Sequence, residues 1–300
     1  MSTAVSPAAN RSYGVRRVCA AWDLPRSSFY ATPAGDRSPA VRPAAPTKRG
    51  PKPTLTDDAL LALIRADLAA SPFQGEGHRK VWARLKVQKG VRTGRKRVLR
   101  IMRENALLSP HRNRRGIGIV HDGTIITEAP GIMWGTDGTR VFTLEQGWVW
   151  IFVAVEHWNA ECVGWHVCKT GSRFAALEPI AAGLTRLYQS VDADSARGLQ
   201  LRMDNGTQYL SDHFLNQIRY WGIQPSFAFI EQPQTNGVAE RFNRTLKEQV
   251  VHGRVFHNIE ELRHAVAAFV EIYNEHWRVE KLGFLTPAEA RLNYARAAAA

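Results

Sequence analysis

The chain has 300 residues, of which 44% are hydrophobic, and it carries a formal net charge of +13. No apolar run reaches the length of a membrane span, and the first 30 residues lack the apolar stretch of a signal peptide, so we expect neither a membrane protein nor a secreted one. Cys19, Cys162 and Cys168 form no disulfide framework and no Cys-x-x-Cys zinc pattern, which favours a reducing, cytoplasmic setting.

The positive charge is concentrated in the first part of the chain. Residues 1–120 hold 24 lysines and arginines against 7 acidic residues, a net charge of +17. Residues 121–300 hold 16 against 20, a net charge of −4. A basic surface attracts polyanions, so we expect a nucleic-acid-binding region followed by a mildly acidic one.

The N-terminal segment predicts a small helical module and a linker. Residues 1–31 contain two short helical patterns joined by a turn at 23–25, and we expect them to bind DNA. Six prolines and scattered basic residues in 32–55 indicate an extended linker. The apolar positions at helical spacing, predicted to face inward, are Val15, Val18, Cys19 and Trp22.

Residues 56–110 have the pattern of three helices, with Thr56 as the expected cap of the first. The third has an apolar side of Val98, Ile101 and Met102 and a basic opposite side. Helix, turn and basic helix is the order of a helix-turn-helix domain, whose last helix enters the DNA major groove. A small bundle with a basic outside is the alternative. The predicted DNA contacts of this helix are Arg95, Lys96, Arg97, Arg100 and Arg103.

A second linker is predicted at 111–130. Its basic residues, Arg112, Arg114 and Arg115, are expected to lie along a phosphate backbone.

Residues 131–252 change in character and predict a mixed α/β layer. Three strands separated by short turns indicate an antiparallel meander, and the whole order is β-β-β-α-β-α-β-α. The second strand, in 147–158, is one continuous apolar run and is expected to be buried on both faces. The tryptophans assigned to the core are Trp134, Trp148, Trp150 and Trp165. Residues 253–300 predict a helical extension.

Three carboxylates stand out in this region. Asp137 lies in the first strand, Asp204 ends the fourth, and Glu240 lies near the start of the last helix. If the first and fourth strands are neighbours, the two aspartates meet, and Glu240 closes the site. Like charges so close raise one another's pKa unless a cation is present, and oxygen ligands favour Mg²⁺ or Mn²⁺. Taken alone, Asp204 fits an ordinary turn equally well.

The last helix is expected to present its charged side to the same site. Glu240, Asn243, Arg244 and Lys247 follow at helical spacing, whereas Phe242, Leu246 and Val250 form a separate apolar face. Lys247, Arg244 and Arg241 are predicted to hold phosphates. Asn243 and Asn236 are further predicted DNA contacts.

These motifs resemble those of retroviral integrases and the related insertion-sequence transposases of bacteria. "WGTDGT" and "RMDNGTQY" look like the two aspartate motifs of that class, and "QTNGVAERFNRTLK" looks like its glutamate helix, with 35 residues between Asp204 and Glu240. "YNEHWRVEKLGFLTPAEA" resembles the closing segment, and "GHRKVWARL" with "VLRIMRENALL" resembles the helix-turn-helix of the catalytic, second-reading-frame subunit. Glu156 and His157 stand where many relatives carry an aspartate, which is not a catalytic position.

The resemblance implies a ribonuclease H-like fold, a mixed five-stranded sheet with flanking helices preceded by all-α helix-turn-helix modules. It implies that Asp137, Asp204 and Glu240 are catalytic and bind two Mg²⁺ or Mn²⁺ ions. We therefore expect a transposase that cleaves a 3′ strand end and transfers it. Its expected partners are the terminal repeats and target DNA, further copies of the chain in a dimer or larger assembly, and a companion first-reading-frame protein or fusion.

Two rival functions remain. A nuclease acting on RNA–DNA hybrids would share the fold but would not need two N-terminal DNA-binding modules. A catalytically silent DNA-binding regulator descended from a transposase would not require the three acids, all of which are present.

Overall fold

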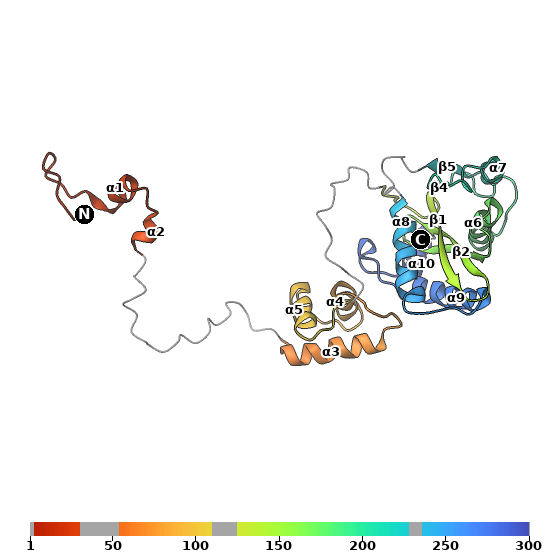
Figure 1. Ribbon diagram of the computed structural model, residues 1–300, viewed down its shortest axis with the longest axis horizontal. Helices are drawn as coiled ribbons and strands as arrows, with labels where there is room; N and C mark the ends of the chain where they lie inside the picture. The colour runs from red at the N-terminus through yellow and green to blue at the C-terminus, as the bar shows by residue number, and fades with distance from the viewer. Residues whose placement is uncertain (1–2, 31–53, 110–124, 228–235, 300) are drawn as a thin grey trace. The chain divides into compact units, whose positions relative to one another are not determined.

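The computed structural model describes residues 3–30, 54–109, 125–227 and 236–299 (Figure 1). The chain divides into two compact units, Met1–Lys52 and Pro53–Ala300. Most of the two predicted linkers, and with them Arg112, Arg114 and Arg115, lies outside the described residues. No helix that the structure describes combines the length and the apolarity needed to cross a bilayer.

The first unit contains two short helices, α1 (Gly14–Ala21) and α2 (Arg26–Phe29). Cys19 is buried as predicted, but the side of α1 predicted to face inward is only partly covered, and Trp22 is 63% exposed. The prediction that Trp22 faces inward was wrong. A four-residue α2 offers too little surface to cover an indole ring.

The second unit begins with a three-helix domain, here called the helical domain, formed by α3 (Asp57–Ala70), α4 (His78–Val87) and α5 (Arg95–Glu104). Thr56 caps α3 as predicted, because its side chain accepts a hydrogen bond from the Ala59 amide at 3.2 Å. The helices enclose a cluster of apolar side chains that includes every residue predicted for the inner side of α5. Its buried members are Leu60, Ile64, Val81, Leu85, Val98, Ile101 and Met102.

A five-stranded sheet follows, with strand order β3-β2-β1-β4-β5. The first three strands form the predicted antiparallel meander, and β4 and β5 run parallel to β1. The first and fourth strands are therefore neighbours, as the carboxylate hypothesis requires. The strands are β1 (Met133–Thr143), β2 (Gly147–Glu156), β3 (Cys162–Cys168), β4 (Gln200–Met203) and β5 (Gln224–Phe227).

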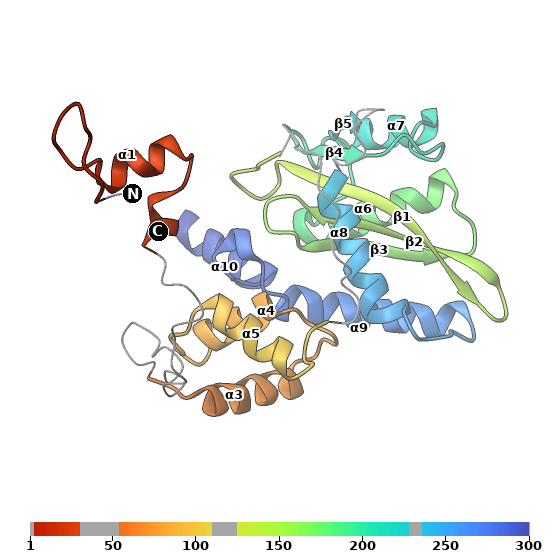
Figure 2. The same cartoon turned by 60° about the vertical axis from the view of Figure 1, so that its left-hand side comes forward.

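Helices cover both faces of the sheet (Figure 2). Alternate residues of β2 point to opposite faces, so Phe152 packs with α6 (Arg173–Tyr188) and α7 (Asp212–Tyr220), whereas Ile151 packs with α8 (Gly237–Leu246) and α9 (Ile259–His276). The fold class predicted from the sequence, a mixed five-stranded sheet with flanking helices behind a helical domain, is confirmed. The remaining elements are the π-helical turn η2 (Lys247–Val251), the 3₁₀ turn η3 (Glu280–Leu282) and α10 (Pro287–Ala298).

The second strand departs from its prediction at one end. Trp148 is 60% exposed, and its ring packs edge-on against Phe142, which is itself 50% exposed. Both rings lie at the turn end of the β1–β2 hairpin, on the side where Arg140 also lies. The prediction of a strand buried on both faces was wrong here, because the hairpin extends past the apolar layer that covers its other end.

Candidate active site

Asp137 and Asp204 lie at the same level on neighbouring parallel strands. The ladder between β1 and β4 ends with the pair Gly135–Arg202, and each aspartate lies two residues further along its strand. Strand β4 ends at Met203, so Asp204 is the first residue beyond it. Asp204 Oδ1 accepts a hydrogen bond from the Gly206 amide at 2.9 Å, so the turn interpretation and the site interpretation hold together.

Helix α8 carries Glu240 in its first turn, above the same end of β1. The apolar face predicted for this helix is buried, since Phe242 and Leu246 are 1% and 0% exposed. Asn243 lies between the helix and the strand, and its Nδ2 donates to Asp137 Oδ2 at 2.8 Å. This hydrogen bond joins the glutamate helix directly to the first aspartate.

The N-terminal end of α8 is fixed to β1 in the same way. Asn236 is 2% exposed, and its Nδ2 donates to the Thr136 carbonyl at 2.8 Å. A Cβ atom on Gly135 would lie 2.9 Å from Asn236 Oδ1 and 3.3 Å from His157 Nε2. Only glycine at 135 leaves room for this close approach.

The surroundings of Asp137 and Glu240 disfavour the ionised form of each carboxyl group. Burial raises the pKa of Asp137, the Asn243 hydrogen bond opposes this, and the charge of Asp204 raises the pKa further. The pKa of Glu240 is also raised, by burial first and then by Asp137, with Arg244 opposing and Asp204 adding to the rise. The three acids therefore lie near enough to repel one another.

The donor chemistry fits a hard divalent cation, because every candidate ligand is a carboxylate oxygen and neighbouring negative charge adds to the effect of burial in raising the pKa values of Asp137 and Glu240. Within the described ranges, however, no group of three or more histidine, cysteine or acidic side chains is spaced closely enough to hold an ion. The three acids lie at one end of the sheet, but their side chains do not surround a single point.

The other residues predicted on α8 fall into two groups. Arg241 and Arg244 are exposed, and Lys247 begins the π-helical turn with its charge lowering the pKa of Asp137. Asn236 and Asn243 are buried instead, and their amide groups point into the protein.

Much of the basic side of α5 is occupied by acidic partners. Arg95 pairs with Glu280 at 3.0 Å, and Arg97 and Arg100 both pair with Asp57. Lys96 and Arg103 are exposed. Helical spacing placed all five residues on one side of the helix, and it does not show which of them pair with acids.

The sequence patterns gave no structural role to two buried polar residues, Arg84 and His157. Arg84 is 7% exposed and lies between Asp67 and Glu76, at 2.8 and 2.5 Å. His157 is 3% exposed, neither ring nitrogen has a hydrogen-bond partner among the described residues, and burial lowers its pKa to about 4, with Lys281 and Arg202 contributing. No local spacing pattern marks either residue.

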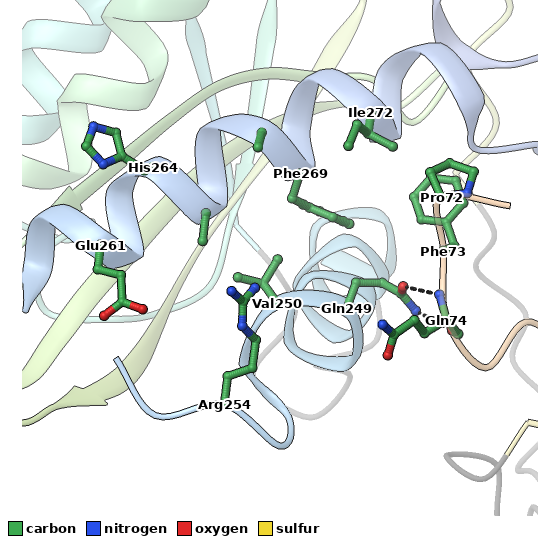
Figure 3. A pocket seen from close by; sticks show the side chains of 12 residues that line it. Pro72, Phe73, Gln74, Gln249, Val250, Arg254, Glu261, His264, Phe269 and Ile272 are labelled. Atoms are coloured by element: carbon green, nitrogen blue, oxygen red, sulfur yellow. Dashed lines mark hydrogen bonds between the residues drawn. The ribbon is translucent and has the colours of Figure 1, made fainter. Parts of the chain in front are cut away.

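A cavity of about 530 Å³ lies away from the acids, between the α3–α4 loop and η2 and α9 (Figure 3). Phe73, Val250, Phe269 and Ile272 supply much of its apolar lining, and none of the three carboxylates lines it.

The HTH-like domain family matches residues 56–115, and the integrase core domain matches 127–233 and, through a second family of that description, 221–287. The transposase for insertion sequence element IS629 of Shigella sonnei is 27% identical over 228 residues, 73% of this chain and 74% of its own length. Transposase InsD for insertion element IS2A/D/F/H/I/K of Escherichia coli is 26% identical over 246 residues, 78% and 79% of the two chains.

Among solved structures, the chain is similar to the catalytic core domain of BIV integrase, with 22% identity and a TM-score of 0.39 over 57% of this chain and 99% of that one. A chain of the simian T-cell lymphotropic virus intasome, in complex with PP2A regulatory subunit B56 gamma, matches with 16% identity and a TM-score of 0.46 over 72% and 70%.

Proposed function

This chain carries an HTH-like domain followed by an integrase core domain and is homologous to insertion-sequence transposases, and we propose that it cleaves DNA strands at the ends of an insertion sequence and joins the freed 3′-OH to target DNA. The observation that carries this proposal is the position of Asp137 and Asp204, level on adjacent parallel strands, with Glu240 held above them on α8.

Asp137, Asp204 and Glu240 would hold two Mg²⁺ or Mn²⁺ ions. When bound, such ions activate the attacking oxygen and stabilise the leaving oxygen of a phosphodiester. The reaction then needs no serine or tyrosine nucleophile, and the acids act as ligands, which requires them to be ionised. The raised pKa values of Asp137 and Glu240 make that requirement pH-dependent.

Asn243 acts as a positioning residue in this scheme. Its amide holds Oδ2 of Asp137 and so fixes the direction of the carboxylate, while each carboxylate oxygen keeps a lone pair for a further partner. Asn236 ties the start of α8 to β1 and fixes the height of Glu240. Their burial supports a role in holding the acids, in place of the DNA contact predicted for both.

The exposed cations of α8 are suited to the DNA backbone. Arg241 and Arg244 extend from the surface beside Glu240, and Lys247 follows one turn later. Guanidinium groups bind phosphate oxygens through two parallel hydrogen bonds, so these residues would place a phosphate over the acids. The free 3′-OH and the target would then be held in line at one site.

The helical domain and the first unit would bind the terminal repeats. Lys96 and Arg103 are exposed members of the predicted α5 set for which no acidic partner is described, and Arg112, Arg114 and Arg115 follow outside the described residues. Joining two ends requires more than one active site, so we propose a dimer or larger assembly on DNA, with a companion first-reading-frame protein or fusion.

A strand-cleavage and joining assay tests this function. Duplexes carrying the repeats that flank the coding sequence are incubated with the wild-type protein and Mg²⁺, with EDTA, and with Glu240→Gln. Glu248→Gln is the matched control, because it removes the same charge from η2, the π-helical turn that directly follows α8. We expect cutting and joining only with the metal, lost in Glu240→Gln and kept in Glu248→Gln.

Binding to the repeats without any chemistry, even with the companion protein present, would contradict the proposal and favour a regulator. Cutting of RNA–DNA hybrids in preference to the repeats would favour a nuclease.

A further inference from the structure

One carboxylate of the core receives two arginines of the helical domain. Arg79 on α4 lies 3.4 Å from Glu280 Oε2, and Arg95 on α5 lies 3.0 Å from Glu280 Oε1. Glu280 begins η3, which follows α9 in the chain, 201 positions after Arg79 and 185 after Arg95. Two successive helices of the helical domain thus direct one cation each at the same acidic group.

Aromatic contacts surround this pair of bridges. The Trp82 ring packs edge-on against Phe284 at 5.4 Å between centroids, and the guanidinium of Arg95 lies 5.9 Å from the Trp82 ring centroid. The charge of Arg95 is therefore paired with Glu280 on η3, and its guanidinium group lies over the Trp82 ring on α4.

A second set of contacts joins the same two parts. The main-chain amide of Gln74 donates to Gln249 Oε1 at 2.9 Å, and Gln249 Nε2 donates to the Gln74 carbonyl at 2.8 Å. Figure 3 shows part of this contact. Phe73 packs edge-on against Trp277 at 4.9 Å, and Lys80 Nζ lies 3.8 Å from the centroid of the same indole. The helical domain is thus held on the C-terminal part of the core by several contacts independent of Glu280.

The side chains at the Glu280 bridges remain accessible to solvent. Those of Arg79, Arg95 and Glu280 are 60%, 46% and 51% exposed. Ion pairs this exposed contribute about 0–1 kcal/mol each, so they hold the domain weakly and a competing anion can replace the acid. Two guanidinium groups converging on two oxygens are also an arrangement that a phosphate group satisfies.

We propose that Arg79 and Arg95 form a phosphate-binding surface for duplex DNA, and that Glu280 occupies this surface until DNA replaces it. The inference rests on the proposed function, because it requires the helical domain to bind DNA. It adds Arg79 to the predicted contacts and makes the C-terminal segment a competitor of DNA. The affinity of the protein for DNA is then lower than it would be if Glu280 did not pair with the two arginines.

Fluorescence anisotropy with a short labelled duplex of arbitrary sequence tests this competition. Glu280→Gln removes the competing charge, and Glu275→Gln is the matched control, because its carboxylate is 62% exposed, belongs to the preceding helix and faces only its neighbour His276 among the described partners. We expect Glu280→Gln to bind about three- to fivefold more tightly than Glu275→Gln, the range that one exposed pair can give.

Salt dependence gives a second readout. Arg79 and Arg95 would each displace a counterion from DNA, so Glu280→Gln should have a slope of log affinity against log salt about 1–2 steeper than a triple variant that also carries Arg79→Gln and Arg95→Gln. The triple variant should also lose the gain in affinity.

Equal DNA affinities of Glu280→Gln and Glu275→Gln, or a triple variant that keeps the affinity and slope of Glu280→Gln, would overturn the inference. If the wild type still cuts and joins the repeats, the proposed function survives that result. If the wild type binds DNA with the expected competition yet performs no chemistry, the surface stands and the proposed function fails.

Discussion

The helical domain and the end of the sheet that carries Asp137, Asp204 and Glu240 differ in how their charges are balanced. In the helical domain, Arg84 is buried between two acids, and Arg97 and Arg100 share Asp57. At the end of the sheet, Asp137 and Glu240 have raised pKa values because burial and like charges prevail over the nearby cations.

The charges of the helical domain are paired with one another and stabilise its fold, whereas the acids at the end of the sheet are suited to bind a cation. A buried acid with an arginine partner stabilises the fold through that partner, and losing the partner is costly. Acids that repel one another destabilise the fold when ionised, and a bound cation removes that cost. The following changes are expected to affect one region and spare the other.

The largest effect on stability is expected from Arg84→Met. This change leaves Asp67 and Glu76 buried without their cation, and we expect the free energy of unfolding to fall by about 3–5 kcal/mol. Urea unfolding followed by circular dichroism measures it. Lys89→Met, at an exposed position just after the same helix, should change the value by less than about 0.5 kcal/mol. A loss below about 1 kcal/mol for Arg84→Met would mean that the triad is not structural.

A pH-dependent effect is expected from His157. Its pKa is lowered to about 4 in the folded protein, against an ordinary value near 6.5, so the unfolded state binds more protons between these values. Stability should therefore fall as pH drops from about 6.5 to about 4, by at most about 3 kcal/mol from this residue. His157→Phe should flatten that dependence, whereas His213→Gln, at an exposed position, should keep it. Identical pH dependence in wild type and His157→Phe would disprove the effect.

Asn243→Leu should affect catalysis through Asp137. The Asn243 hydrogen bond lowers the pKa of Asp137, so its removal should raise that pKa and shift the acid limb of the pH–rate profile to higher pH. We expect cleavage at neutral pH to slow about 10- to 100-fold, as when a residue supporting a metal ligand is lost. A slower rate with an unmoved acid limb would indicate a general loss of structure instead.

The smallest effects should come from two adjacent residues of α5. Lys96→Gln should weaken DNA binding a few-fold without changing stability, because Lys96 is exposed. Arg97→Gln should instead lower the free energy of unfolding by about 1 kcal/mol, because Arg97 pairs with Asp57 and donates to the Leu55 carbonyl. Anisotropy and urea unfolding on both variants measure this contrast, which fails if the two variants behave alike.

The sequence predicted what depends on local spacing. A continuous apolar run located β2, an aspartate directly after a buried run located the end of β4, and helical spacing separated Phe242 and Leu246 from Glu240. These features are set within a few residues of one another, so a pattern along the chain is enough to find them.

Partners distant in the sequence could not be predicted in this way. Nothing near Arg95 indicates that Glu280 lies opposite it, 185 positions away, and nothing near Asn243 shows that its amide reaches Asp137. The exposure of Trp148 likewise depends on where the hairpin passes the flanking helices, which the apolar run itself does not encode. Each outcome follows from tertiary packing.

Thermal unfolding with increasing Mn²⁺ tests most directly whether the three acids form one cation site. Binding to the folded state alone stabilises it, by about 2.7 kcal/mol at a hundredfold excess over Kd. The wild type and Glu248→Gln should therefore melt at higher temperature as Mn²⁺ is added, and Asp137→Asn and Glu240→Gln should not. A rise of equal size in all four proteins, or none in the wild type, would contradict the account.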